Sequence, residues 1–329
     1  MRPDLSVIIV SFNCRGELAA CLDSLPAGAG GLALETIVVD NASRDGAARM
    51  VAERFPQVRL VANERNRGFA AANNQGLAMA SGRCVLFLNP DTLVRPGAME
   101  TLVRTLDGDP AIGICAPQLL NADGTIQPSL RREPTFAALL HQYTPLRVLG
   151  LLKGAHRRYK MGEFDFRTAS DVEVVMGAAF CVPERVLAQV GRLDERFFVY
   201  FEEMDFCRRV REAGCRVRFE PAAQIMHVGG VSAASATSNL FFCRSLFRYL
   251  RKHNGPLKGR AMVWVLRLGM FLREAMLLVG NLAAALGLGL MSKTRLGELR
   301  PDRARRRLAG AKSAARFLFR DGWLTLFCA

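Results

Sequence analysis

The 329-residue chain lacks the features that mark several specialised classes of protein. Its nine cysteines form no CxxC pair, and such an odd, scattered set predicts buried thiols in a reducing compartment, not a disulfide framework. Its 29 glycines and 14 prolines follow no fixed period, which excludes a collagen-like chain. Because half of the residues are hydrophobic, general disorder is excluded as well.

Targeting and membrane-spanning signals are equally scarce. Met1 is followed at once by Arg2, Pro3 and Asp4 and then by a strand-like run, so we expect no secretory signal there. The longest charge-free part of the C-terminal third is residues 275–291, which includes Asn281 and three glycines. Its 17 residues are at the short limit for a helix that spans a membrane.

Positive charge is concentrated at one end of the chain. The net charge is +15, and residues 231–329 hold 18 Lys and Arg against 4 Asp and Glu, whereas residues 1–230 hold 27 against 26. We therefore expect residues 236–329 to form basic amphipathic helices that lie on, or dip into, an anionic membrane surface. A buried helical hairpin is the alternative. Nucleic acid is not an expected partner, because this region has no interleaved aromatics and no nucleic-acid-binding motif.

Short apolar runs alternate with helical stretches over the first 120 residues. Continuous hydrophobicity, as in LSVIIV (5–10), is typical of strands that are covered on both faces. Strands of this length separated by single helices indicate an α/β fold with a mostly parallel central sheet. The expected strands are 5–12, 34–40, 58–62 and 84–89, and the expected helices are 17–25, 47–55 and 69–81.

The pattern weakens after residue 120 and later returns. Residues 121–171 read as a variable connection over the active edge of the sheet. Beyond this connection we expect a strand over 172–182, a short helix with Pro183 as its first residue, a helix over 202–213 that ends before Gly214, and a strand over 215–220.

Four polar segments follow strands or open a helix, at the places where α/β sheets bind ligands. Taken singly, such a segment is more often a helix cap or a turn, and two acids that open a helix can simply favour its dipole. The occurrence of all four in one chain favours a site. They are SFN (11–13), DNASRDG (40–46), NPDT (89–92) and EEMD (202–205).

Together with neighbouring residues, these segments resemble the motifs of the family-two inverting glycosyltransferases, and more narrowly their bacterial rhamnosyltransferase-like branch. The resemblance implies a GT-A nucleotide-diphospho-sugar transferase fold over residues 1–235, followed by the helical region 236–329. The resembling motifs are VSFN (10–13), VVDNASRDG (38–46), NRGFAAANNQG (66–76), FLNPDT (87–92), GAAFCVPERVL…VGRLDERFFVYFEEMDFCRRVREAGCRV (177–217) and HVGG (227–230).

The resemblance assigns eight residues to the nucleotide-sugar donor. Asp40 and Asn41 match the positions that hold the nucleobase and ribose, where an acceptor can bind an imide N–H. Residues 66–73 match a segment that closes over the donor, in which Gly68 permits close approach of the backbone. The other donor-binding candidates are Ser11, Asn13, Asn66, Asn73 and Asn89.

The resemblance also implies a divalent cation, Mg²⁺ or Mn²⁺. Asp91 matches the final acid of the family's DxD motif, which stands here as NPD, so the first acid is missing. One carboxylate and a diphosphate can still hold the ion, because Mg²⁺ takes few protein ligands and keeps water. His227 matches a second ligand of some relatives, although a packing role stays open; an imidazole suits Mn²⁺ better.

The EEMD segment matches the position of the catalytic base. In the family an acid here removes the proton from the acceptor hydroxyl, and Glu203 aligns best with it, with Glu202 as the fallback. The usual pair is Glu-Asp, so the longer side chain of Glu203 moves its carboxylate by one methylene. Asp205 precedes Arg208 and Arg209 by three and four residues, which predicts an ion pair within the helix.

The implied reaction is a single displacement with inversion. A sugar, tilted toward rhamnose by the resemblance, would move from a nucleotide diphosphate to a hydroxyl of a glycan or polyprenyl-diphosphate-linked acceptor in cell-envelope polysaccharide assembly. We expect such a protein at the cytoplasmic face of the inner membrane, peripheral or shallowly inserted.

Two alternatives stay open. The missing first acid and the Glu-Glu pair leave open a catalytically idle GT-A module that binds a membrane surface, although the intact Asp91 and Glu203 argue against it. A sugar nucleotidyltransferase would share the fold, but SFNCRGEL (11–18) has one glycine and does not resemble a triphosphate-binding loop. A dehydrogenase would need G-x-G-x-x-G in the same place.

Overall fold

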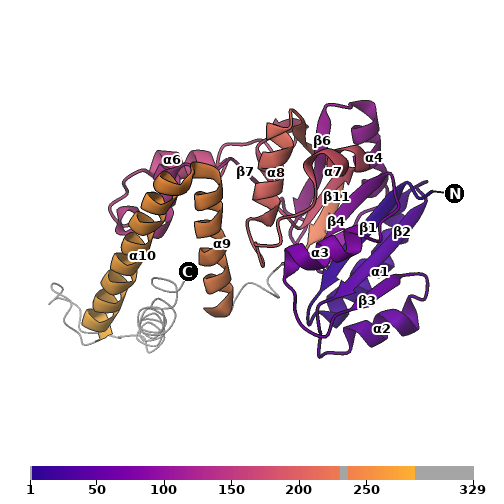
Figure 1. Cartoon of the computed structure of the whole chain (residues 1–329), viewed down its shortest axis with the longest axis horizontal. Coiled ribbons are helices and arrows are strands. Elements are labelled where there is room, and N and C mark those ends of the chain that lie inside the picture. Colours follow the sequence, from indigo (N-terminus) through magenta and orange to yellow (C-terminus); the bar gives the residue numbers. More distant parts are fainter. Residues whose placement is uncertain (1, 230–235, 286–329) are drawn as a thin grey trace. The chain divides into compact units, whose positions relative to one another are not determined.

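The computed structural model describes residues 2–229 and 236–285, and the chain divides into two compact units (Figure 1). The first unit comprises residues 1–133 and 160–245, and the second comprises residues 134–159 and 246–329. The sequence placed the boundary after residue 235. The structure instead adds residues 134–159 to the second unit, because they form helices that pack together and contact a helix of the C-terminal region.

A nine-stranded mixed sheet forms the centre of the first unit. Its strands are β1 (Leu5–Ser11), β2 (Leu34–Asp40), β3 (Arg59–Ala62), β4 (Cys84–Leu88), β5 (Thr92–Val94), β6 (Ile112–Leu120), β8 (Ser170–Val172), β10 (Ala179–Pro183) and β11 (Arg216–His227). The order is β3-β2-β1-β4-β10-β6-β11-β5, with β8 also paired to β11. The first four strands are parallel, whereas β10 runs antiparallel to β4 and β6.

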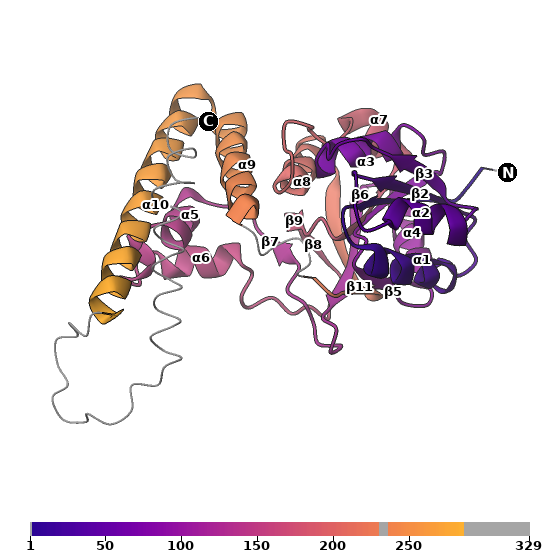
Figure 2. The same cartoon turned by 90° about the horizontal axis from the view of Figure 1, so that it is seen from below.

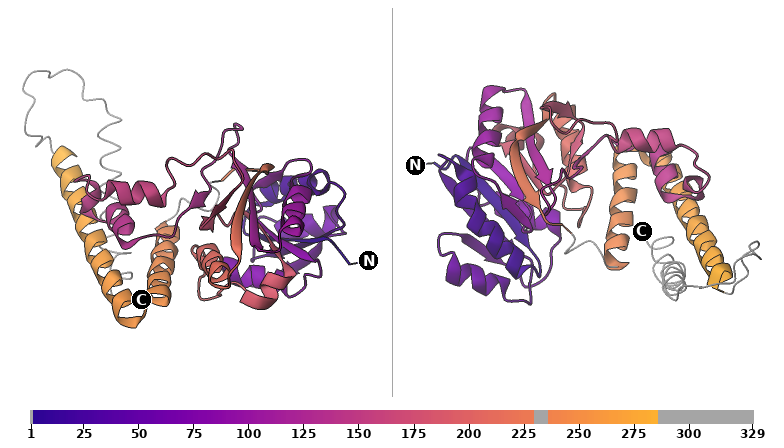
Figure 3. Two further views of the ribbon diagram at one scale, coloured as in Figure 1. Left: turned by 90° about the horizontal axis from the view of Figure 1, so that it is seen from above. Right: turned by 180° about the vertical axis from the view of Figure 1, so that it is seen from behind.

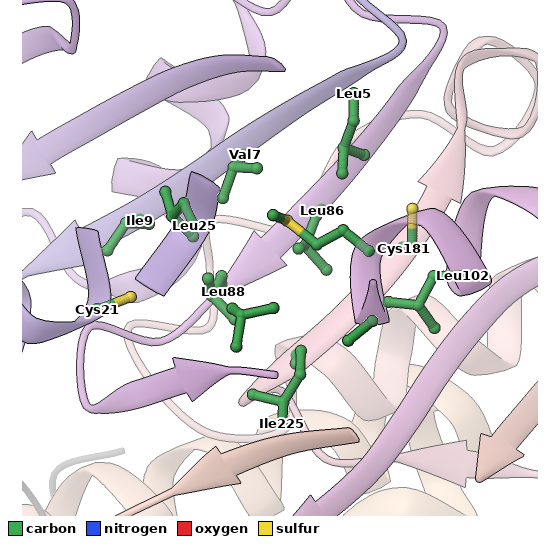
Figure 4. Packing of buried hydrophobic residues seen from close by; sticks show 14 of the residues in the cluster. Leu5, Val7, Ile9, Cys21, Leu25, Leu86, Leu88, Leu102, Cys181 and Ile225 are labelled. Carbon is green, nitrogen blue, oxygen red and sulfur yellow. The ribbon is translucent and has the colours of Figure 1, made fainter. Parts of the chain in front are cut away.

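Helices cover both faces of this sheet, as the continuous apolar strands predicted (Figure 2). On one face Val7 and Ile9 of β1 pack in a cluster with α1 (Arg15–Ala29), α2 (Ala47–Arg54) and α4 (Ala98–Gly108). Figure 4 shows part of this cluster, including Leu25 of α1 and Leu102 of α4. The other face of β1 and its neighbours packs against α3 (Phe69–Leu77), α7 (Glu184–Val190) and α8 (Glu202–Glu212).

Three expected elements differ from the structure. The strand expected over 172–182 is wrong: the run is divided into β8, β9 (Val174–Val175) and β10, and β9 pairs with β7 (Leu130–Arg131) outside the main sheet. The run is apolar apart from Glu173, because its pieces are buried in different strand pairs. Pro183 ends β10 and caps α7 with an extended backbone, so it is not the first helical residue. The last expected strand continues as β11 to His227, past an irregularity in its pairing with β6 after Glu220.

The cysteines are dispersed through this core. The eight within the described residues form no disulfide, and all but Cys215 are buried, which confirms the prediction of buried thiols. Cys328 lies outside the described residues.

The described part of the second unit is helical. It contains α5 (Phe136–Tyr143), η1 (Pro145–Arg147), α6 (Lys153–Tyr159), the end of α9 (Ala236–Asn254) and α10 (Pro256–Ala285). Gly269 of α10 leaves room for Thr144, whose side chain would collide with a Cβ there. Figure 3 shows α9 and α10 joined by a short turn. Within residues 2–229 and 236–285, no helix is both long and apolar enough to cross a membrane, and residues 286–291 of the charge-free run lie outside these ranges.

Candidate active site

The polar segments that follow β1, β2 and β4 meet at one end of the sheet. The parallel register pairs Ser11 with Asp40 at the carboxyl ends of β1 and β2. The backbone N–H of Asn89, after β4, donates to the carbonyl of Ala178 at 2.8 Å, which joins the turn before β10 to the same end. Parallel strands bring their carboxyl ends together in this way at the ligand-binding edge of α/β folds.

Asp40 retains a free acceptor at this edge. The carboxylate is 3% exposed, and its Oδ2 accepts a hydrogen bond from the backbone N–H of Ser43 at 3.0 Å. Its Oδ1 is buried and has no hydrogen-bond partner among the described residues. A buried carboxylate oxygen without a partner is costly, and it fits a ligand that brings an N–H group, such as a nucleobase imide.

Asn41, in contrast, is bonded within the protein. It is 2% exposed, its Nδ2 donates to the carbonyl of Gly68 at 3.1 Å, and its Oδ1 accepts from the backbone N–H of Arg67 and from Nδ2 of Asn63, both at 3.1 Å. Both lone pairs of the amide oxygen are therefore used. The structure gives Asn41 the role of holding residues 63–68 beside the end of β2.

The other predicted donor-binding side chains also make internal contacts. Oδ1 of Asn13 accepts from the backbone N–H of Arg44 at 2.8 Å, which ties the loop after β1 to the loop after β2. Oδ1 of Asn66 accepts from the N–H of Gly68 at 2.8 Å. Two buried residues contact their own segments: Nδ2 of Asn73 donates to the carbonyl of Phe69, and Oγ of Ser11 lies 3.4 Å from Sγ of Cys14.

Gly68 permits a close backbone approach, as predicted, but the partner is another part of the chain. Its φ is +86°, and a Cβ at this position would lie 2.5 Å from the carbonyl oxygen of Phe198. The next residue, Phe69, donates its N–H to the same carbonyl at 2.6 Å. Asn74, which the sequence did not single out, adds a second tie by donating from Nδ2 to the carbonyl of Leu193 at 2.8 Å. The start of α3 is thus fastened to the loop that leads into α8.

Asp91 and His227 come from distant parts of the sequence and lie side by side. β5 pairs with β11 so that His227 is opposite Thr92, and the N–H of Val228 donates to the carbonyl of Asp91 at 3.0 Å. Oδ1 of Asp91 is 3.4 Å from Nε2 of His227, a distance longer than a good hydrogen bond, and each side chain is 13% exposed.

A carboxylate oxygen and an imidazole nitrogen that face one point fit a divalent cation such as Mn²⁺. Within the described part of the chain, no group of three or more His, Cys, Asp or Glu side chains could hold a metal ion. Asp91 and His227 therefore offer two ligands, and the others would have to come from a diphosphate or water.

Glu202 and Glu203 open α8 after a strained loop. Tyr200 and Phe201 have φ values of 70° and 69°, a region that side chains of this size rarely adopt. Glu202 is 4% exposed, whereas Glu203 is half-buried, and Oε2 of each is buried with no hydrogen-bond partner among the described residues. Glu203 is thus the more accessible acid of the pair.

Gly177 lies against the side chain of Glu203. A Cβ on Gly177 would lie 3.4 Å from Cβ and 3.5 Å from Cγ of Glu203. The next residue, Ala178, accepts the backbone hydrogen bond of Asn89, two residues before Asp91. This path brings Glu203 to the same end of the sheet as the NPD segment.

Burial changes the titration of both acids. It raises the pKa of the Glu202 carboxyl well above its usual value, and the nearby charge of Glu203 raises it further. Burial also raises the pKa of Glu203, against which hydrogen bonds from backbone N–H groups at the start of α8 act. A carboxylate with a raised pKa is a stronger base than a solvated one.

The loop before Glu202 is held by the first turns of α9, which the sequence did not predict. The rings of Phe198 and Phe241 stack with centroids 4.5 Å apart, and the ring of Phe242 lies 5.2 Å from that of Phe201. Ser245 adds a hydrogen bond from its Oγ to the carbonyl of Val199 at 2.8 Å. Each strained residue costs about 1–3 kcal/mol, so contacts of this kind are needed to keep the loop in place.

Asp205 has the structural role that its spacing predicted. It is fully buried, and its Oδ2 accepts a hydrogen bond from Nε of Arg209 at 2.9 Å. Arg208 pairs elsewhere, with Glu212. The guanidinium of Arg209 also donates to the carbonyls of Val190 and Arg192, so the pair fastens α8 to the end of α7.

Known proteins resemble this chain in sequence. Residues 6–167 match the family model for Glycosyl transferase family 2. Over 301 residues the chain is 25% identical to the N-acetylglucosaminyl-diphospho-decaprenol L-rhamnosyltransferase of Mycobacterium tuberculosis, which covers 84% of this chain and 94% of that protein. It is 26% identical over 221 residues to a low-salt glycan biosynthesis hexosyltransferase of Haloferax volcanii, which covers 66% of this chain and 64% of that protein.

Solved structures resemble it in fold. A mannosyltransferase from Pyrobaculum calidifontis, in complex with GDP-Man and Mn²⁺, superposes with a TM-score of 0.54 at 19% identity, over 98% of this chain and 88% of that one. The structure of GalNAc-T7 with UDP, GalNAc and Mn²⁺ also gives a TM-score of 0.54, at 17% identity, over 76% of this chain and 48% of that one. The chain therefore carries a Glycosyl transferase family 2 domain with the GT-A fold that its motifs predicted.

Proposed function

We propose that this glycosyltransferase is an inverting, metal-dependent hexosyltransferase that uses a nucleotide-diphospho-sugar. Its acceptor is a hydroxyl of a glycan or polyprenyl-diphosphate-linked saccharide in cell-envelope polysaccharide assembly. The observation that carries the proposal is the convergence of Glu203, Asp91 and His227 at the sheet end that also holds the unpaired oxygen of Asp40. The name of the mycobacterial relative supports a lipid-linked acceptor and rhamnose as the sugar.

Glu203 acts as the base in this proposal. Its buried Oε2 accepts the proton of the acceptor hydroxyl as that oxygen bonds to the anomeric carbon and the bond from this carbon to the diphosphate oxygen breaks. Attack opposite the leaving group inverts the anomeric centre. Glu202 is nearly inaccessible, which favours Glu203 for this step.

Asp91 and His227 would hold the cation that stabilises the leaving diphosphate in this proposal. A divalent ion bound there would neutralise the charge that develops on the diphosphate, as electrostatic stabilisation of this kind does in other enzymes. The leaving group then needs no proton from an acid, so a single base is sufficient. Asp40 contributes to donor binding by accepting a hydrogen bond from the nucleobase.

The test is a screen of nucleotide sugars with a polyprenyl-diphosphate-linked acceptor, with and without Mn²⁺. We expect transfer from one donor, dependent on the cation, with an inverted anomeric configuration in the product by NMR. Retention of configuration would contradict the proposal, and so would cation-dependent donor binding without transfer to any acceptor, which would favour the idle binding module. Asp91→Asn is the matched variant, since it removes the charge and keeps the shape.

We propose further that the second unit binds an anionic membrane surface. One face of α10 packs within the unit, and the opposite face is exposed although it is apolar. The exposed apolar residues of α10 are Leu257, Trp264, Val265, Leu268, Phe271, Leu272, Met276, Leu277 and Val279. Residues 134–159 and 246–285 contain eleven Lys and Arg against one acid, Glu274, so the charge of this unit complements anionic lipid.

Binding at the cytoplasmic face of the inner membrane, peripheral or shallowly inserted, would bring the site to its lipid-linked acceptor. We expect Trp264→Ser with Leu268→Ser to reduce co-sedimentation with anionic phosphatidylglycerol vesicles, while the matched substitution Ala261→Ser leaves it unchanged. Unchanged sedimentation of the double variant would contradict this surface. Truncation before α9 is a poorer test, because Phe241 and Phe242 hold the loop before Glu202.

A further inference from the structure

Gln127 lies beside His227 and is not part of any motif that the resemblance carries. It follows the turn 121–125 at the end of β6, in which the N–H of Asn121 donates to the carbonyl of Thr125. The N–H of Gln127 itself donates to the carbonyl of Leu119. Its side chain is 2.8 Å from Nδ1 of His227, on the side of the ring opposite Asp91.

The orientation of the Gln127 amide is determined by two acceptors. Its Nε2 donates to Oδ1 of Asn121 at 3.0 Å and to the backbone carbonyl of His227 at 3.3 Å. A backbone carbonyl can only accept, so the NH₂ group must face it. The amide oxygen is then the atom that faces Nδ1 of His227, and because that oxygen can only accept, Nδ1 must carry the hydrogen.

The orientation of Asn121 is determined independently. The carboxylate of Asp123 accepts the backbone N–H of Thr125 at 3.0 Å, and as an ionised carboxylate it can only accept. Thr125 therefore donates its hydroxyl hydrogen to Asp123, at 2.6 Å, and its oxygen accepts from Nδ2 of Asn121, at 2.9 Å. Oδ1 of Asn121 is therefore the atom that accepts from Gln127. Each side chain in this series, from His227 through Gln127, Asn121 and Thr125 to Asp123, donates a hydrogen bond to the next one.

In the neutral imidazole this direction leaves Nε2 of His227 without a hydrogen, and Nε2 is the nitrogen 3.4 Å from Asp91. Two acceptors that converge in this way repel one another unless a cation lies between them. We infer that Gln127 is a positioning residue that holds His227 as the Nδ1–H tautomer, with its Nε2 lone pair aimed at the cation site of Asp91. The inference rests on the proposed function, and it adds the turn 121–125 to the apparatus of that site.

The first test needs no metal and no variant of Gln127. Two-bond ¹⁵N–¹H NMR of the imidazole rings, with His227 assigned by His227→Asn, should show hydrogen on Nδ1 and a bare Nε2 at pH 8. Hydrogen on Nε2 would overturn the inference, whatever the fate of the proposed reaction.

The second test measures Mn²⁺ affinity in the presence of dTDP or UDP, from the EPR signal of the free ion. Residues that hydrogen-bond to a metal-ligating histidine typically contribute about 10–100-fold in metal affinity, so Gln127→Leu should weaken binding by that factor. Gln127→Glu retains an acceptor for Nδ1–H and should stay within about threefold of the unmodified protein. Gln189→Leu is the matched control. Gln189 is exposed, and its side chain donates a hydrogen bond to the carbonyl of Ala213, the residue that follows the C-terminal end of α8.

The outcomes of the second test separate the two hypotheses. If the unmodified protein binds Mn²⁺ and Gln127→Leu binds it equally well, the positioning role is wrong. If neither protein binds Mn²⁺ with either nucleotide, the metal site of the proposed function fails, and the NMR experiment alone decides the tautomer.

Discussion

The two sides of the site use their polar groups differently. Beside β2 and α3, the side-chain amide oxygens of Asn13, Asn41 and Asn66 accept hydrogen bonds from backbone N–H groups of the loops there. Beside β4, β11 and α8, the carboxylates of Glu202 and Glu203 each retain a buried oxygen without a partner. The first arrangement stabilises loops, and the second is costly unless a ligand or proton completes it.

Asp40 is the exception that clarifies the comparison. It lies on the saturated side but keeps Oδ1 unpaired, whereas Asn41, the next residue, has no lone pair to spare. Hydrogen-bond saturation therefore divides residues that build the site from residues that meet a ligand, even between neighbours in a motif. The following variants test this division, in order of expected effect.

Glu203→Gln should lower kcat by about 10²–10⁴-fold, because the amide cannot accept the acceptor proton. Donor binding, measured by isothermal titration calorimetry with Mn²⁺, should persist. Glu202→Gln is the matched control on the same helix and should keep most of the turnover. Loss of donor binding in Glu203→Gln would mean that this acid is structural.

Asp91→Asn should lower kcat by about 100-fold, as the cation that stabilises the diphosphate is no longer anchored by a charge. The same variant should lose the Mn²⁺-dependent part of its affinity for dTDP or UDP. An unchanged affinity in that titration would remove Asp91 from the metal site.

The pH dependence of kcat should show an acid limb that belongs to Glu203. Burial raises its pKa above the ordinary carboxyl value of 4.5, and the base must be ionised, so activity should fall about tenfold per pH unit below that raised pKa. A steady-state profile between pH 5 and 9 measures this limb. A flat profile down to pH 5 would contradict a buried carboxylate base.

Asn41→Ala should destabilise the protein by about 1–3 kcal/mol, since it leaves the N–H of Arg67 and the amide of Asn63 without their acceptor. Urea unfolding measures the free energy. Because Asn41 positions a loop and does not touch the reacting atoms in our proposal, we expect Asn41→Ala to raise KM for the donor while kcat changes little. A large fall in kcat at unchanged stability would place Asn41 among the ligand-binding groups.

Glu202→Gln should have the smallest effect on turnover and an effect of the opposite sign on stability. The folded-state pKa of Glu202 is raised, so its carboxyl favours folding fully only below the ordinary value of 4.5, and stability is lost as pH rises toward the raised pKa. A neutral amide escapes this loss. The variant should therefore gain stability over the unmodified protein at pH 8.5 relative to pH 5, by about 1.4 kcal/mol for each pH unit by which the pKa is raised. If the two proteins differ in stability by the same amount at both pH values, the pKa of Glu202 is not raised by burial.

Local patterns were enough to predict most of the first unit. The strands that contain Leu5, Leu34 and Cys84 and the helices that follow them lie where continuous apolar runs and turn residues placed them, because both are short-range properties of the chain. The divided run 172–182 was misread because burial against three partners looks the same in sequence as burial within one strand.

The residue types at the site were predictable from the motifs, but their duties were not. The sequence by itself determined that acids and amides follow the strands of an α/β sheet and open one helix, since strand period and helix-start signals are local. Only the tertiary structure decided that Asn41 is saturated, that Asp40 is not, and that Gln127 reaches His227 across 100 residues. Hydrogen-bond saturation depends on which groups long-range packing brings within about 3 Å, and sequence spacing carries no record of that distance.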